Sequence, residues 1–67
     1  MKLYKFNNGD GIVAIDVDAI CSIQAEGEKG IRYIFRGSSI ANNISCQSKW
    51  HRNEELQTII SMMEDEF

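Results

Sequence analysis

The C-terminal stretch, residues 53–67, carries a stripe of large apolar side chains at helical spacing. The stripe consists of Leu56, Ile59, Ile60, Met63 and Phe67. These positions recur with the 3.6-residue period of an α-helix and would lie on one face of it. Asn53 is predicted as the N-cap, because its side-chain oxygen can accept a hydrogen bond from a free amide of the first turn. A helix this short is not stable alone in water, so we expect its stripe to pack against the rest of the chain.

The chain before this helix has the pattern of short β-strands separated by turns. Glycine- and asparagine-rich turn signals occupy residues 7–11, 26–30 and 37–39. The predicted strands are 2–7, 12–17, 20–25, 31–36 and 40–46. Residues 16–19 are expected either to bend the chain or to form a single helical turn.

Two of the predicted strands have individual features. Residues 12–17 are mostly apolar on both faces, which is typical of a central strand. Asn42 and Asn43 form strands poorly and mark either a bulge or an exposed edge.

The order of these elements predicts one α+β domain over residues 1–67. Its sheet, about 2–46, is expected to be an antiparallel meander of four or five strands, either open or rolled into a small barrel. One C-terminal amphipathic helix, about 53–66, would cross a sheet face or close one end of the rolled sheet. The composition, 43% hydrophobic and 25% charged residues, is that of a globular protein.

The two-sided apolar strands also predict self-association. Residues 12–15 and 33–35 place apolar side chains on both faces of a sheet, and one helix can cover only one face. We therefore expect a two-fold homodimer, which is the commonest oligomeric form. A closed barrel would be the solution within one chain.

Charge and cysteine content restrict the environment and the partners. The net charge of -3 and the pI near 4.9 argue against a general electrostatic attraction to nucleic acid or anionic lipid. No apolar run approaches the roughly 20 residues that span a bilayer, and no signal peptide is visible. Cys21 and Cys46 are too few for a disulfide framework and are expected to be buried free thiols. A cytoplasmic location is expected, without a membrane partner.

The sequence contains no pattern that predicts catalysis, a metal or a cofactor. Cys21, Cys46 and His51 are the only soft metal ligands, and their spacing is not that of a zinc site. Cys46 with His51 lacks a third, orienting group for nucleophilic catalysis. Asp16 and Asp18 lack the further oxygen ligands and the glycine of a calcium loop. We therefore predict a protein that is not an enzyme and needs neither metal nor disulfide.

The candidate binding residues are basic and aromatic side chains from the fourth predicted strand and the segment before the helix. They are Arg32, Arg36, Lys49, Trp50 and Arg52. Tryptophan and arginine dominate binding hot spots, so the cluster predicts a protein partner of unknown identity. In the alternative interpretation, Trp50 lies in the core and the arginines are merely solvated.

Part of the sequence resembles a known family. The run LYKFNNG at residues 3–9 is similar to the strand and turn that open the small FlbD-like flagellar proteins. The segment AIDVDAICSI at 14–23 resembles their next segment, and residues 31–37 and the closing helix follow in the same order. The chain lacks the family's proline-aspartate-threonine turn and inserts residues 38–53. The resemblance implies the order of the fold and no functional residue.

These observations predict a small non-catalytic protein-interaction or regulatory module of the kind encoded by bacteria and phages. One alternative is a nucleic-acid-binding regulator that uses Arg32, Arg36 and Trp50, although the acidic charge makes nucleic acid an unfavourable partner. The other alternative is a small-molecule-binding domain with a pocket between sheet and helix.

Overall fold

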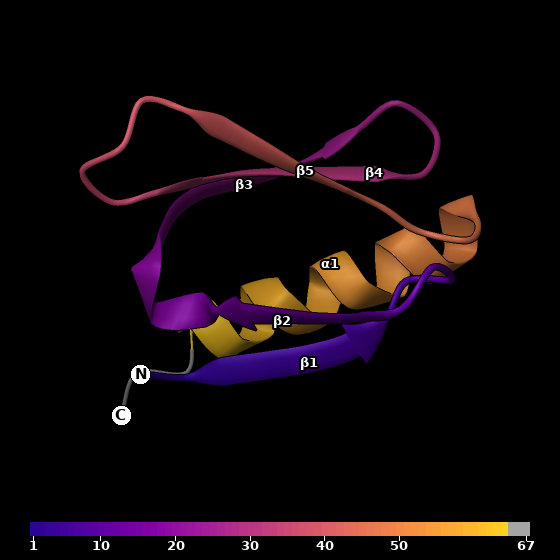
Figure 1. Ribbon diagram of the computed structural model, residues 1–67, viewed down its shortest axis with the longest axis horizontal. Helices are drawn as coiled ribbons and strands as arrows, with labels where there is room; N and C mark the ends of the chain where they lie inside the picture. Colours follow the sequence, from indigo (N-terminus) through magenta and orange to yellow (C-terminus); the bar gives the residue numbers. More distant parts are fainter. Residues whose placement is uncertain (65–67) are drawn as a thin grey trace.

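The computed structural model describes residues 1–64 and confirms an α+β fold of antiparallel strands followed by one C-terminal helix (Figure 1). The elements in chain order are β1 (Leu3–Asn7), β2 (Ile12–Asp16), the 3-10 turn η1 (Val17–Ala19), β3 (Ile20–Glu26), β4 (Gly30–Phe35), β5 (Ala41–Ser45) and α1 (Lys49–Glu64). All five strands lie where the turn signals and alternating patterns predicted them. The helical turn at η1 resolves the choice left open for residues 16–19.

The strands form two sheets instead of one meander. β1 pairs with β2, and β3, β4 and β5 form a separate three-stranded sheet in that order. The prediction of a single meander is therefore wrong, and so is the closed barrel. The interpretation of β2 as a central strand is also wrong, because within residues 1–64 it pairs only with β1. Its apolar outer side chain, Ile12, is 69% exposed.

The turn between β1 and β2 is shaped by its asparagines. The Asn7 and Asn8 side-chain oxygens accept hydrogen bonds from the backbone N–H groups of Gly9 and Asp10, at 2.8 and 3.0 Å. Gly9 has a φ of 105°, and a Cβ there would lie 2.6 Å from Cγ of Gln47. The backbone conformation favours glycine, and any larger residue would also have to displace the Gln47 side chain.

A corner at η1 directs the chain from the first sheet to the second. Asp16 caps this turn, since its Oδ1 accepts from the backbone N–H of Asp18 at 3.2 Å and from that of Lys2 at 3.3 Å. Val17 is 1% exposed and fills the corner. The corner separates strands that the sequence alone would place in one sheet.

The second sheet has one irregular and one regular edge strand. The β3–β4 register shifts between Ile20 and Ser22, so the bulge falls at Cys21. Pairing of β4 with β5 is regular through Asn42 and Asn43. The sequence predicted that these asparagines mark either an exposed edge or a bulge. The edge strand is confirmed, and the bulge is wrong.

Helix α1 begins at Lys49, earlier than the predicted start at Asn53. Ser48 is the residue that caps it: its Oγ accepts from the backbone N–H of His51 at 3.0 Å, and its carbonyl accepts from that of Arg52 at 2.9 Å. Asn53 therefore lies inside the helix and is not its N-cap. The predicted end of the helix and Phe67 fall outside the described residues.

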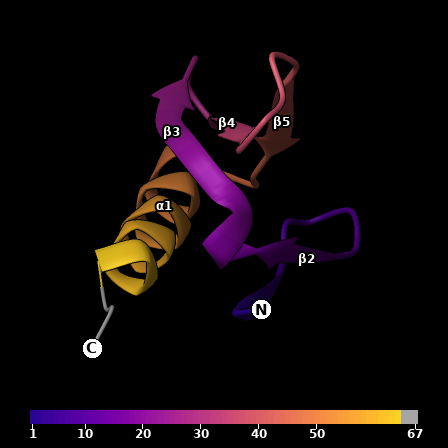
Figure 2. The same cartoon turned by 90° about the vertical axis from the view of Figure 1, so that its left-hand side faces the viewer.

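The helix packs along one side of both sheets. The core lies between the helix and the two sheets (Figures 1 and 2). The core residues are Phe6, Ile15, Val17, Ile20, Ile31, Ile44, Cys46 and Ile59. They come from every strand or its flank and from the helix. Ile59, a member of the predicted stripe, is fully buried, and Leu56 and Met63 pack beside the core. Within residues 1–64, no helix has both the length and the apolar character that crossing a membrane requires.

Candidate functional site

Trp50 lies on the surface, in the first turn of α1. Its side chain is 73% exposed, and Nζ of Lys49 lies 5.9 Å from the centre of its ring. This geometry is that of a cation–π contact at an exposed site. The alternative interpretation that placed Trp50 in the core is therefore wrong.

Arg52, two residues after Trp50, lies on the opposite side of the helix from it and is 5% exposed. Its Nη1 donates to the carbonyl of Gly30 at 2.9 Å and to that of Gly27 at 3.4 Å, and its Nε donates to Oδ1 of Asn53 at 2.7 Å. These bonds attach the start of the helix to the β3–β4 turn. Arg52 is therefore a structural link that fixes the first turn of α1, which carries Trp50.

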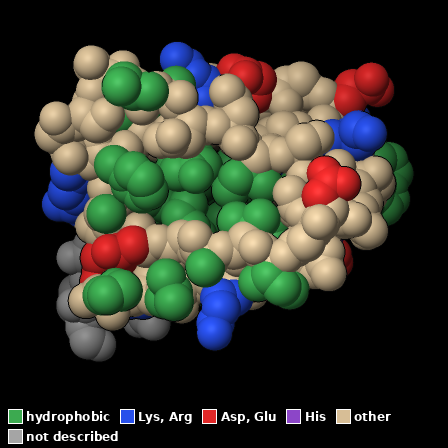
Figure 3. Space-filling model, viewed as in Figure 1, with side chains coloured by type: hydrophobic (Ala, Val, Ile, Leu, Met, Phe, Trp, Pro, Cys, Tyr) green, Lys and Arg blue, Asp and Glu red, His purple; other side chains and the backbone are tan. Residues whose placement is uncertain are grey.

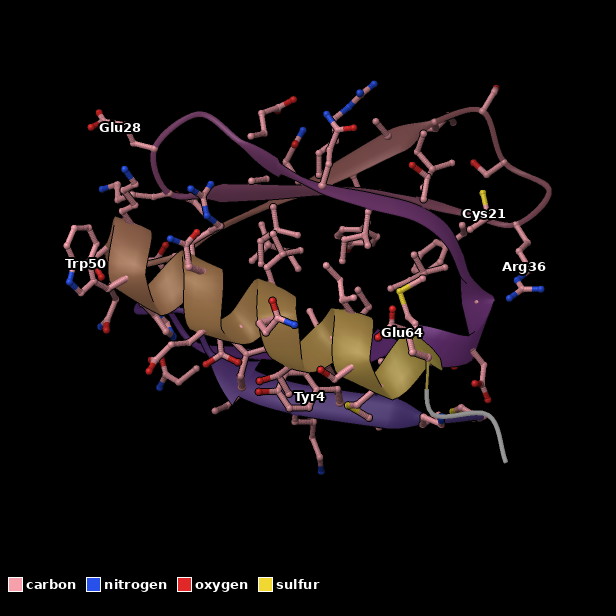
Figure 4. The ribbon with its side chains drawn as sticks, turned by 180° about the vertical axis from the view of Figure 1, so that it is seen from behind. Tyr4, Cys21, Glu28, Arg36, Trp50 and Glu64 are labelled. Atoms are coloured by element: carbon pink, nitrogen blue, oxygen red, sulfur yellow. The ribbon has the colours of Figure 1, made fainter. Side chains whose placement is uncertain are left out.

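The two arginines of the fourth strand do not join Trp50. Arg32 is half-buried, and its Nε lies 3.8 Å from the Glu26 carboxylate on the neighbouring strand. Arg36 follows β4 and is exposed at the far end of the molecule from Trp50 (Figure 4). Of the five candidate binding residues, the structure brings together only Lys49 and Trp50 at one exposed position.

A network of polar contacts begins at His51, next to Trp50, and was not predicted from the sequence. His51 Nδ1 accepts from the backbone N–H of Gln47 at 3.3 Å, and its Nε2 lies 3.2 Å from Oε2 of Glu55. The other Glu55 oxygen accepts a hydrogen bond from the Tyr4 hydroxyl. The network connects the helix to the loop before it and to β1. The spacing of Ser48 and His51 resembles a capping box with histidine in the place of glutamate, and this signal could have located the helix start.

The environment of Tyr4 keeps its phenol protonated. The pKa of Tyr4 is raised to about 12, first by burial and then by the hydrogen bond and the negative charge of Glu55. A contact with Thr58 acts weakly in the opposite direction. Tyr4 is therefore a hydrogen-bond donor that secures β1 to the helix.

The two cysteines are free and differ in exposure. Cys46 is buried, whereas Cys21 is exposed, which corrects the prediction that both are buried. Burial, followed by the charge of Glu55, raises the pKa of the Cys46 thiol. A thiol with a raised pKa is a poor nucleophile. Among residues 1–64, no three histidine, cysteine or acidic side chains lie close enough together to hold a metal ion.

A shallow groove runs along the outer side of α1 beside β1. It is lined by Tyr4, Asn53, Glu54, Glu55, Gln57, Thr58, Ser61 and Met62. The groove is open to solvent, so it does not have the enclosed form typical of a small-molecule site. It also lies outside the interface of sheet and helix, where a small-molecule pocket was expected.

Hydrophobic side chains reach the surface between the two sheets, on the face turned away from α1 (Figure 3). The inward-facing side chains Val13, Tyr33 and Phe35 are only half-buried. Ile40, just before β5, is 70% exposed.

Comparisons with known proteins returned no matching family model, curated protein or solved structure. The resemblance to the FlbD-like proteins therefore stays a prediction.

Proposed function

We propose that the chain is a small, non-catalytic protein-interaction module whose partner binds around Trp50. The observation that carries this proposal is the 73% exposure of a tryptophan on a helix turn that is fixed from three directions. The Ser48 cap, the Arg52 bonds to the β3–β4 turn and the His51–Glu55 contact hold that turn in place. A large aromatic side chain on a rigid base loses little conformational entropy when it binds.

The neighbours of Trp50 indicate the chemistry of the partner. Tryptophan is enriched at the centres of interfaces, where it fills an apolar pocket. Lys49 places a positive charge at the rim of this contact. The partner surface that fits is an apolar pocket with an acidic rim.

Two observations favour a protein over nucleic acid as the partner. Arg36 lies far from Trp50 (Figure 4), and the Arg32 guanidinium lies 3.8 Å from the negatively charged Glu26 carboxylate. The net charge of -3 opposes binding to a phosphate backbone. The raised pKa makes the Cys46 thiol a poor nucleophile, which favours binding over cysteine catalysis.

The test is affinity capture from a bacterial lysate with three forms of the protein. The wild type is compared with Trp50→Ala and with the control Ile12→Ala. Ile12 is 69% exposed and lies on β2, so the control removes a similarly exposed apolar side chain elsewhere. We expect a protein that is captured by the wild type and by Ile12→Ala and lost with Trp50→Ala.

The thermal melting curve must be the same for all three forms, because both substituted side chains are exposed. Equal capture by Trp50→Ala would contradict the proposal. So would recovery of nucleic acid as the main ligand, with binding that falls steeply as salt is raised.

A further inference from the structure

We propose that the free edge of β5 binds β5 of a second copy, in an antiparallel pair across a two-fold axis. This inference concerns a surface other than Trp50 and does not depend on the proposed function. Its occupant is the same chain, and the pairing would join two three-stranded sheets into one.

The hydrogen-bond pattern of β5 shows which backbone groups are free. Cys46 N–H donates to the carbonyl of Lys29 at 2.9 Å, and the register then alternates along β4 and β5. Ile44 and Asn42 therefore exchange backbone bonds with β4, whereas the N–H and C=O groups of Ala41 and Asn43 point away from it. In residues 1–64 no strand pairs with that edge.

One end of this edge is already occupied. The side-chain amide of Asn8 donates to the carbonyl of Ser45 at 3.1 Å. The β1–β2 turn thus covers the Ser45 end and leaves the section around Ala41 and Asn43 open to a second strand.

The chemistry of β5 fits a second copy of itself. The sequence ANNIS contains no charged residue and no proline, and its pairing with β4 has no bulge. Natural edge strands usually carry one of these features to prevent strand addition. The opposite edge strand, β3, has both a bulge at Cys21 and an acidic residue, Glu26. An uncharged strand meets no like-charge repulsion when it pairs with its own copy.

Two-fold symmetry, the Asn8 contact and the start of β5 at Ala41 together select the one register in which both Ala41 and Asn43 pair with residues of the second β5. In it, Ala41 exchanges backbone hydrogen bonds with Asn43 of the second copy, and Asn43 with the second Ala41. The two copies of Asn42 then face each other at the axis as a non-hydrogen-bonded pair, with Cα atoms about 4.5 Å apart. Ser45 stays bonded to Asn8 in both copies.

This register also covers an exposed apolar side chain. Residues 40, 42 and 44 have the same parity, so Ile40 falls beside Ile44 of the second copy. Ile40 is 70% exposed in the single chain. The second copy would cover it, and the burial of apolar area stabilises association.

A disulfide at the axis tests the register. Asn42→Cys and Asn43→Cys are made separately in a Cys21→Ser background, because Cys21 is the exposed native thiol. A Cα separation of about 4.5 Å permits a disulfide, so Asn42→Cys should form a covalent dimer under mild oxidation. Asn43 is the more exposed of the two positions but faces Ala41 in the second copy, so Asn43→Cys should cross-link at least roughly tenfold more slowly. Faster cross-linking at position 43 would overturn the register.

Sedimentation equilibrium tests the surface itself. The wild type should be a dimer at high micromolar concentration. Ile40→Lys should raise the dimer dissociation constant roughly tenfold or more, since it places two charges against the second copies of Ile44. Ile12→Lys alters an equally exposed isoleucine on β2 and should leave the dimer intact. A monomeric wild type, or dissociation by Ile12→Lys and not by Ile40→Lys, would refute the proposal.

Discussion

Arg52 and Tyr4 show that single residues connect elements that are distant in the sequence. Arg52 donates to carbonyls of the β3–β4 turn, and Tyr4 donates to Glu55 on α1. Neither hydrogen bond could be predicted from the apolar periodicity of the helix or strand that contains the residue. A basic residue near the positive end of a helix opposes the helix dipole, which is itself a sign that Arg52 has another role.

Replacement of Arg52 should destabilise the fold. Arg52→Ala removes a buried cation together with its bonds to two carbonyls, and we expect a loss of about 2–4 kcal/mol in the free energy of unfolding. Urea denaturation measures this loss. Arg36→Ala is the matched control, because Arg36 is exposed and its loss should cost less than about 0.5 kcal/mol. Equal losses for both variants would show that Arg52 is not a structural link.

Tyr4 should make the fold sensitive to alkaline pH. Its pKa is about 12 in the folded protein and about 10 in an unfolded chain, so folding favours the protonated phenol. This contribution to stability is complete below about pH 10 and is lost as the pH rises towards 12. Tyr4→Phe should be less stable at neutral pH but should lose less stability between about pH 10 and 12. Parallel stability curves for the two proteins over this range would contradict the assignment.

At the scale of elements, the start of α1 is where the sequence-based prediction failed. The apolar stripe begins at Leu56, so its periodicity does not predict that residues 49–52 form the first turn of the helix. Only the capping pattern at Ser48 marks the true start. The cap also determines where Trp50 stands, because it makes that residue part of a helix turn instead of a loop.

Replacement of the cap should weaken the helix. Ser48→Ala should lower the free energy of unfolding by about 1 kcal/mol, because the N–H of His51 loses its acceptor. Ser61→Ala, at an exposed position of the same helix, should change it by less than about 0.5 kcal/mol. Thermal denaturation compares the two. Equal, small losses for Ser48→Ala and Ser61→Ala would contradict the assignment of Ser48 as the cap.

The strands were predictable because alternation and turn residues are local signals, whereas their grouping into sheets was not. Residues 12–15 are apolar on both faces whether the strand is central or at an edge, and the structure leaves Ile12 exposed. The corner at Asp16 and Val17 decides which strands can pair, and its direction depends on long-range packing. Trp50 was chosen as a candidate by its residue type, but neither its exposure nor the distance of Arg36 from it could be predicted from the sequence spacing.

At the scale of the whole molecule, α1 connects two sheets that do not pair with each other. Ile59 is fully buried among residues from both sheets. A small domain has a low free energy of unfolding, so the loss of the Ile59 packing contacts is expected to destabilise the whole fold.

Substitutions at Ile59 should therefore have large effects. Ile59→Ala should cost about 2–5 kcal/mol and Ile59→Val about 0.5–1.5 kcal/mol, because each leaves a cavity among the sheets and the helix. Urea denaturation measures the losses, and amide spectra of Ile59→Ala should show both sheets weakened together.

A chain that ends at Arg52 should show no cooperative melt. Retention of a cooperative melt by that chain would refute the organising role of the helix.

The most direct test of the central claim is the affinity of the captured partner for Trp50 variants. Titration calorimetry with the purified partner should show at least roughly 30-fold weaker binding for Trp50→Ala than for the wild type, which corresponds to about 2 kcal/mol at a binding hot spot. Ile12→Ala should bind like the wild type, and Trp50→Phe should lie between the two. A change of less than about threefold for Trp50→Ala would contradict the account of this chain as a module that binds through Trp50.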